Sequence, residues 1–295
     1  MTVFSMSPQY KNILSPRQHI LETISNLQFM IQELQALNFR LLLQIWRQPS
    51  PLIAGLLQPL LWLILFGALF QNAPVSLFSS NTKYGQFLSA GIIVFTAFTG
   101  SLNAGLSLMF DREFGFLNRL IVAPLVSKES IIFSSTIFIS IISIGQVILI
   151  ICASIFLGHK VLNSQGLLLI AFIILLITLG VTMFSLNLAF ILPGHIELLA
   201  FILITNLPFL FSSTALAPLS FMPLWMQILA SLNPLSYAIE TVRFIYENNI
   251  YTLESSIIET IWGTLTLQEI IALFILIDIL GILIIKKFVL SKLKY

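Results

Sequence analysis

Six long runs of mostly apolar residues limit what this chain can fold into more than any other feature. Each is about as long as the roughly 20 residues that an α-helix needs to cross the hydrocarbon core of a membrane. The runs are apolar on every face and lack the ten-residue alternation of membrane β-strands. We therefore predict an all-α membrane protein with six transmembrane helices, over residues 52–70, 87–110, 131–157, 166–192, 198–219 and 265–285.

The composition excludes several other classes of protein. Only 9% of the 295 residues are charged and the mean hydropathy is +1.00, whereas a soluble domain carries about 25% charged residues. The net charge of +2 comes from scattered cations, and a nucleic-acid-binding surface needs clustered ones. A single cysteine, Cys152, and three distant histidines provide neither a disulfide nor a metal site.

The distribution of Lys and Arg predicts the orientation in the membrane. Eleven of the 14 fall in alternate segments that include both ends of the chain. By the positive-inside rule both termini are expected on the cytoplasmic side, or on the stromal side in an organelle. The long segment after the fifth run holds four glutamates and one arginine, so we expect it outside. No cleavable signal peptide is expected, because the first 50 residues lack the basic and apolar regions of one.

The chain divides into four predicted parts. Between Ile20 and Trp46, apolar residues recur at steps of three and four, which predicts an amphipathic helix before the break at Pro49 and Pro51. This helix is expected along the cytoplasmic interface, or packed on a partner subunit. The parts are a flexible tail (1–19), a cytoplasmic amphipathic helix (20–48), a six-span domain (49–290) and a basic tail (291–295).

Charged residues cluster in the short segment after the second run. Beyond them, apolar residues fall on one face of a short helix, which Pro124 would stop: Phe114, Leu117, Leu120 and Ile121. The segment either displays this helix to the cytoplasm or is a loop whose charges only enforce topology.

The outer segment after the fifth run predicts two short amphipathic helices, over residues 224–232 and 235–246, separated by Asn233 and Pro234. Neither is long enough to span a membrane, so we expect short re-entrant helices in the outer leaflet. They can serve as a gate or as an inert lid. Glu240 and Arg243 are three residues apart and can pair along the second helix.

One acid lies deep in the sixth run. Asp278 is about 12 Å of helix from Lys286, which places it near the middle of the membrane. An acid there costs several kcal/mol and is a functional candidate, although it can instead serve helix assembly. The first five runs each hold one amide, which we assign to bonds between helices in preference to substrate contacts: Gln58, Asn103, Gln146, Asn187 and Asn206.

Two of these segments together resemble the ABC-2 type transporter permeases, most closely the daunorubicin-resistance-like branch with members from cyanobacteria and plastids. The stretch over residues 111–125, DREFGFLNRLIVAPL, is similar to the family's acidic-x-Gly element that ends in Pro. The stretch over residues 232–243, LNPLSYAIETVR, is similar to its outer Asn-Pro-x-x-Tyr signature. The resemblance covers the chain from about residue 32 onward. It departs from the family pattern at residues 116–118 and 241–242, which puts the branch in question.

The resemblance implies a role for particular residues. The first element would couple the chain to a separate ATP-binding subunit, through Asp111, Arg112, Glu113, Gly115, Arg119 and Pro124. The second would form an outer gate, through Asn233, Pro234, Tyr237, Glu240 and Arg243. Two permease chains would pair around the translocation path as a homodimer among membrane lipids. The membrane would be a bacterial or cyanobacterial inner membrane or a plastid membrane.

The sequence predicts a transport subunit and not an enzyme. It has no Gly-x-x-x-x-Gly-Lys-Ser/Thr loop for phosphates, so ATP and Mg²⁺ are expected in a partner chain and no cofactor in this one. We expect an ATP-driven exporter of a lipophilic small molecule or a lipid, with a polysaccharide or glycolipid exporter as the alternative. The apolar runs do not contain the spacing of catalytic residues that a membrane enzyme needs. The sequence also shows no inverted repeat of the kind expected in a secondary carrier.

Overall fold

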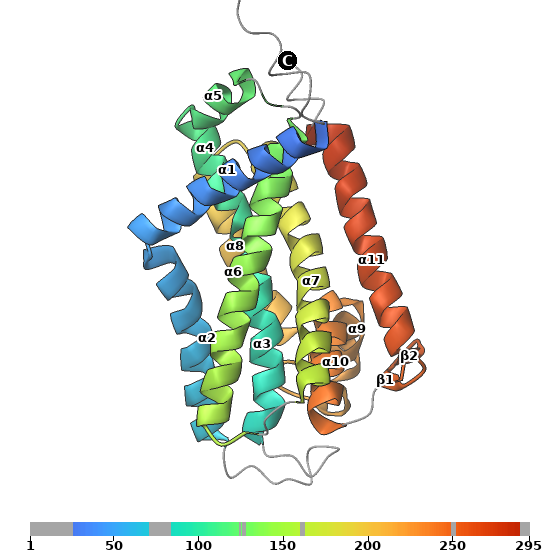
Figure 1. The fold of residues 1–295 in the computed structure, drawn as a ribbon. Helices are drawn as coiled ribbons and strands as arrows, with labels where there is room; N and C mark the ends of the chain where they lie inside the picture. The colour runs from blue at the N-terminus through green and yellow to red at the C-terminus, as the bar shows by residue number, and fades with distance from the viewer. Residues whose placement is uncertain are drawn as a thin grey trace, which may run out of the picture.

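The computed structural model describes residues 26–70, 84–123, 125, 128–159, 163–248 and 252–289 (Figure 1). Helices make up almost all of the regular structure. The α-helices are α1 (Asn26–Arg47), α2 (Ser50–Leu69), α3 (Tyr84–Leu102), α4 (Ala104–Glu113), α5 (Phe116–Val122), α6 (Glu129–Phe156), α7 (Ser164–Ile191), α8 (His195–Phe211), α9 (Leu224–Leu232), α10 (Pro234–Glu247) and α11 (Leu267–Ile284).

Three short elements complete the described chain. A 3₁₀ turn, η4 (Leu219–Phe221), precedes α9, and a π-helical turn, η5 (Ile285–Val289), follows α11. The strands β1 (Ser256–Thr260) and β2 (Gly263–Thr266) form an antiparallel hairpin directly before α11. The sequence analysis did not predict this hairpin. It ends at Thr266, whose side chain caps α11 in a reciprocal capping box with Glu269.

The membrane-length helices confirm the prediction of an all-α membrane protein. In the described ranges, five helical segments are long and apolar enough to cross a membrane: α2, α3 continued by α4, α6, α7, and α11 with the start of η5. A sixth apolar helix, α8, has 17 residues, which corresponds to roughly 26 Å. A sixth crossing through α8 stays a prediction.

The fifth predicted run differs from the helix that it contains. It was expected to be helical over residues 198–219, but α8 begins at His195 and ends at Phe211. The chain beyond Phe211 turns inward, and Ser213, Thr214 and Ala215 are buried. A buried loop needs apolar residues just as a membrane helix does, so hydropathy did not reveal where the helix ends.

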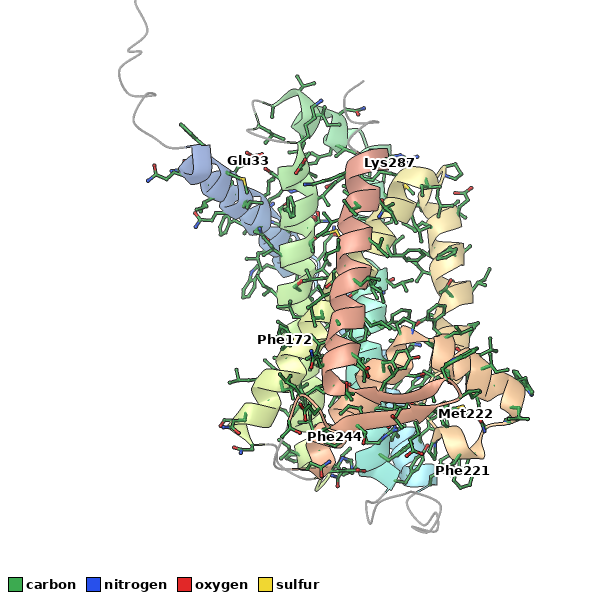
Figure 2. The ribbon with its side chains drawn as sticks, turned by 90° about the vertical axis from the view of Figure 1, so that its right-hand side faces the viewer. Glu33, Phe172, Phe221, Met222, Phe244 and Lys287 are labelled. Carbon is green, nitrogen blue, oxygen red and sulfur yellow. The ribbon has the colours of Figure 1, made fainter. Side chains whose placement is uncertain are left out.

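The two ends of the bundle carry different elements. At one end, α1 lies across the upright helices, and α5 and the C-terminal end of α11 lie at this same end (Figure 1). At the opposite end lie α9, α10 and the hairpin. Figure 2 shows the same separation from the side, with Glu33 and Lys287 at one end and Phe221, Met222 and Phe244 at the other. The two predicted functional segments therefore lie at opposite ends of the molecule.

Helix α3 forms the centre of the bundle. Nearly all of its residues are buried, and it packs against α2, α6, α7 and α10. Helix α1 packs on α6 of its own chain and buries Leu37 and Leu41, while Trp46 stays 86% exposed. The predicted amphipathic helix is therefore present from Asn26 onward. Its first part and both predicted tails (1–19 and 291–295) lie outside the described residues.

Candidate functional site

The charged residues at the end of α4 each contact a different part of the chain. Asp111 pairs with α1, because Arg40 donates from Nη2 to its Oδ2 atom at 2.8 Å. The guanidinium of Arg40 also lies 4.5 Å from the ring centroid of Phe116, the first residue of α5. This cation–π contact and the ion pair together fix α1 against the junction of α4 and α5.

Arg112 closes the C-terminal end of α7. Its Nη1 atom donates to the carbonyl of Ala189 at 2.7 Å, and its Nη2 atom donates to those of Leu192 and Pro193 at 3.1 and 2.9 Å. The last carbonyls of a helix have no partners within it, and a cation there also complements the helix dipole. Arg112 therefore holds the turn between α7 and α8 to the end of α4.

Glu113 binds the N-terminus of α8. Its Oε1 atom accepts from the backbone N–H of His195 at 2.6 Å, and its Oε2 atom lies 2.5 Å from Nδ1 of the same residue. A carboxylate at a helix N-terminus satisfies free N–H groups and interacts favourably with the dipole. Asp111, Arg112 and Glu113 thus join α4 to α1, α7 and α8. We call these three residues the junction triad.

Helix α5 extends from the junction triad across Gly115. That residue has φ of +73°, a left-handed conformation that favours glycine and lets the chain turn sharply between α4 and α5. Leu117 is buried, whereas Phe114 and Val122 are 80% and 85% exposed, and Arg119 is also exposed. Phe114 precedes Gly115, so it does not share the inner face of the helix with Leu117. Pro124 lies outside the described residues.

The predicted outer element begins with a well-formed helix start. The side chain of Asn233 caps α10 by accepting from the N–H of Leu235 at 3.0 Å, and Pro234 occupies the first helical turn. The Nδ2 atom of Asn233 donates to the carbonyl of Phe209 at 2.8 Å and to Ser212 Oγ at 3.2 Å. Asn233 therefore connects the end of α8 to the start of α10.

The predicted apolar face of α10 is entirely buried, which matches the periodicity seen in the sequence: Leu235, Ala238, Ile239, Val242, Ile245 and Tyr246. Tyr237 is buried as well, and its hydroxyl donates to the carbonyl of Ser231 in α9. α10 packs against α3 and α7. In this conformation α10 is an integral part of the bundle, because the residues that the sequence predicted to be on its apolar face all belong to the buried hydrophobic core.

Arg243 is the cation of α10 and is buried, with only 7% of its surface exposed. It forms an ion pair with Glu240, as the spacing predicted, and its Nη2 atom donates to the carbonyl of Thr214 at 3.0 Å. Its guanidinium also lies 3.5 Å from the ring centroid of Phe87 in α3. These contacts hold α10 to the loop after α8 and to the central helix.

Asp278 lies near the middle of α11 and is 9% exposed. Its Oδ1 atom has no hydrogen-bond partner among the described residues, so no helix-to-helix bond through this atom is present there. Asp278 lines a cavity of about 260 Å³ between α3, α7, α8, α10 and α11. Apart from Asp278 and Thr205, the lining residues are apolar, aromatic or glycine.

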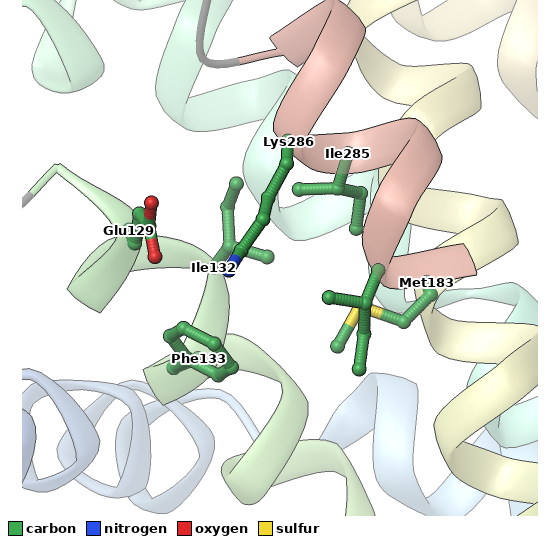
Figure 3. A pocket seen from close by; sticks show the side chains of 7 residues that line it. Glu129, Ile132, Phe133, Met183, Ile285 and Lys286 are labelled. Carbon is green, nitrogen blue, oxygen red and sulfur yellow. The ribbon is translucent and has the colours of Figure 1, made fainter. Parts of the chain in front are cut away.

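A second, much smaller cavity lies between α6, α7 and the end of α11 (Figure 3). Lys286 extends over Ile132 and Phe133 there, and Glu129 lies at the edge. Its volume is about 10 Å³, which is at the lower limit for one water molecule. This cavity is too small for a transported molecule. No cluster of potential metal ligands occurs within the described parts of the chain.

Several contacts of the predicted site residues could not be found from the sequence. Arg40, His195 and Thr214 were not singled out, although each contacts a predicted site residue. Arg40 is 71 positions from Asp111, and His195 is 82 positions from Glu113. No local spacing rule connects residues so far apart, and only the tertiary structure brings them together.

The fold and these sites define an all-α, multi-pass integral membrane protein whose two ends carry distinct polar elements. The chain belongs to the ABC-2 type transporter family, which it matches over residues 32–246. It is 62% identical over 252 residues to the "Putative transport permease ycf38" of Porphyra purpurea, covering 85% of this chain and 87% of the relative. It is 51% identical over 259 residues to the protein of that name from Cyanophora paradoxa, covering 88% and 89%. The chain is accordingly a membrane permease of an ABC transporter.

Proposed function

We propose that this permease is the membrane subunit of an ATP-driven exporter and that a separate ATP-binding subunit docks on α5. The observation that carries the proposal is the exposed surface formed by Phe114, Arg119 and Val122, which we call the α5 face. Large apolar side chains that are 80% or more exposed at a polar end of a membrane protein are typical of a protein interface.

The contacts beneath the α5 face can transmit a movement into the membrane. α5 follows α4 directly, and the junction triad bonds α4 to α1, to the end of α7 and to the start of α8. A displacement of α5 by the ATP-binding subunit therefore acts on several membrane helices at once. We assign the junction triad to this transmission and the α5 face to the docking itself.

The apolar surface of the bundle supports pairing of two permease chains. α2 buries only Pro59 and Leu63 within its own chain. Trp62 of α2 lies beside Phe211 of α8, with ring centroids 6.3 Å apart, so these two helices present one continuous apolar face. We propose a homodimer across this face, with membrane lipid around the rest. The substrate proposed is a lipophilic small molecule or a lipid, since the cavity inside the bundle is almost wholly apolar.

Val122→Asp tests the docking assignment. Because Val122 is 85% exposed, the variant is expected to fold and insert normally. A carboxylate buried without a partner at an interface is strongly unfavourable, so recovery of the ATP-binding subunit should fall at least about tenfold. The measurement is affinity capture of the tagged permease from its native membrane, with the ratio of the two chains determined by mass spectrometry.

Leu253→Asp is the matched control, because Leu253 is 58% exposed and lies at the other end of the molecule, where its carbonyl accepts from the N–H of Gln268 at the start of α11. This control should retain the ATP-binding subunit. Full recovery of that subunit with Val122→Asp, together with unchanged ATP hydrolysis by the complex, would remove the docking role of the α5 face.

A further inference from the structure

The cavity beside Asp278 has a composition that suits one chemical class of ligand. Four phenylalanines of four helices supply much of its wall, and two of them, Phe98 and Phe209, stack with ring centroids 5.5 Å apart. A cavity of about 150 Å³ with such walls can hold benzene, and this one has about 260 Å³. It can therefore hold a bicyclic ring or one end of a longer apolar molecule.

The only ionisable group in the lining is Asp278, and its Oδ1 atom is buried without a hydrogen-bond partner. A buried acceptor without a donor is costly, and a carboxylate in apolar surroundings costs more. A water molecule normally needs two to four polar partners, whereas the lining side chains offer Asp278 and Thr205 alone. The carboxyl group is best satisfied by a ligand that brings its own donor.

The neighbouring helix α7 packs directly against this carboxyl group. Gly180 of α7 faces Asp278, and a Cβ atom at this position would lie only 2.8 Å from Oδ1. Any other residue there would press on the carboxyl group. The glycine thus lets α7 and α11 approach each other closely at Asp278, which is the twelfth of the 21 residues in the membrane-length segment of α11.

We propose that this cavity binds a lipophilic amine, with the protonated amino group on Asp278 and the apolar body between the phenylalanines. A protonated amine is the matching partner because it donates hydrogen bonds and also compensates the charge of the carboxylate. This inference rests on the proposed function, since it gives the chemical class of a molecule that the exporter carries. The outer wall of the cavity includes Pro234, so the ligand would lie directly beneath the predicted gate element.

Two probes of nearly equal shape test the inference: 1-naphthylmethylamine and the neutral hydrocarbon 1-ethylnaphthalene. Binding is measured by equilibrium dialysis of each labelled probe against the full chain in nanodiscs, with empty nanodiscs of the same lipid subtracting partition into the bilayer. The wild type should bind the amine at least about tenfold more tightly than the hydrocarbon. Asp278→Asn should bind both probes about equally, because it keeps the shape and removes the charge.

Two further variants make the test decisive. Val181→Phe narrows the cavity and should weaken the binding of both probes, and this variant tests the location even if Asp278→Asn does not fold. Glu254→Gln removes an exposed carboxylate elsewhere and should bind as the wild type does. The inference would be overturned by equal affinity of the wild type for the two probes, by an amine preference that persists in Asp278→Asn, or by unchanged binding of both probes to Val181→Phe.

The measurement needs neither ATP nor a partner chain. A failure of amine binding in a permease that still co-purifies with an ATPase would refute the ligand class and leave the exporter proposal standing. Amine binding by a permease that never associates with an ATPase would refute the exporter proposal and leave the binding site.

Discussion

Arg243→Met is expected to lower the midpoint of thermal unfolding by on the order of 10 °C. The substitution keeps an unbranched side chain of similar length but removes the charge from a largely buried ion pair. Glu240 would then be left without its partner, and the carbonyl of Thr214 would lose its donor. Breaking a buried pair by removing one partner costs about 3–5 kcal/mol, which is much of a protein's stability.

The loss of stability in Arg243→Met should arise mainly at the contacts that hold α10. α10 is held to the loop after α8 through Thr214 and to α3 through the Phe87 ring, and both contacts depend on the guanidinium. Arg243→Lys keeps the charge but not the planar fork, so its midpoint should lie between those of the wild type and Arg243→Met.

The measurement is a thermal-shift series on the detergent-purified protein. Arg47→Met is the control, because Arg47 is exposed at the end of α1 and its removal should change the midpoint little. An unchanged midpoint for Arg243→Met would show that this network does not hold the outer helices in place.

Arg112→Met should loosen the turn between α7 and α8. Three hydrogen bonds to backbone carbonyls disappear together, and hydrogen bonds to charged groups are each worth about 1.5–3 kcal/mol when they are well shielded. Arg112 is only partly buried, so we expect a net loss of about 2 kcal/mol. Where an amide exchanges through local opening of the structure, a loss of local stability of this size speeds its hydrogen exchange at least about tenfold.

Hydrogen–deuterium exchange of the purified permease is the direct measurement. The amides over residues 192–198 should exchange faster in Arg112→Met, while those of the buried helix α3 should not change. Arg47→Met again serves as the control for a lost cation at the same end. Identical exchange in the wild type and Arg112→Met would contradict the role of this residue in holding α7 and α8 to α4.

Much of the fold could be predicted because the membrane simplifies the relation between sequence and structure. In hydrocarbon every backbone group must bond within its own helix or to protein, so long apolar runs become helices. The boundary at Asn233 and Pro234 was also predictable, since a capping side chain followed by proline is a local signal for a helix start. Both helices at this boundary occur nearly where the sequence placed them.

Other features depend on partners that are distant in the sequence. The second membrane segment continues to Glu113, beyond the end of its apolar run at Phe110, because its three charged residues find partners on α1, α7 and α8. The sequence places these charges outside the membrane but cannot show that they are already engaged within the chain. Their proximity to α5 was predictable, while their contacts were not.

The cavity is the clearest example of what a pattern leaves open. From its position alone, Asp278 was compatible with a functional role and with a bond to a neighbouring helix. Which of these applies depends on the residues opposite, and these come from α7, including Gly180, and from three further helices, α3, α8 and α10. The sequence alone does not show which residue a glycine in an apolar run will face, because that depends on how the helices pack.

This chain is proposed to couple to an ATP-binding subunit and to move its cargo with the energy of ATP. The most direct test is to purify the chain from its native membrane in mild detergent, identify the co-purifying proteins and measure ATP hydrolysis. We predict a stoichiometric partner with a phosphate-binding Gly-x-x-x-x-Gly-Lys-Ser/Thr loop, and measurable ATPase activity of the complex. A permease that purifies alone, without a nucleotide-binding partner even after cross-linking, would contradict the account.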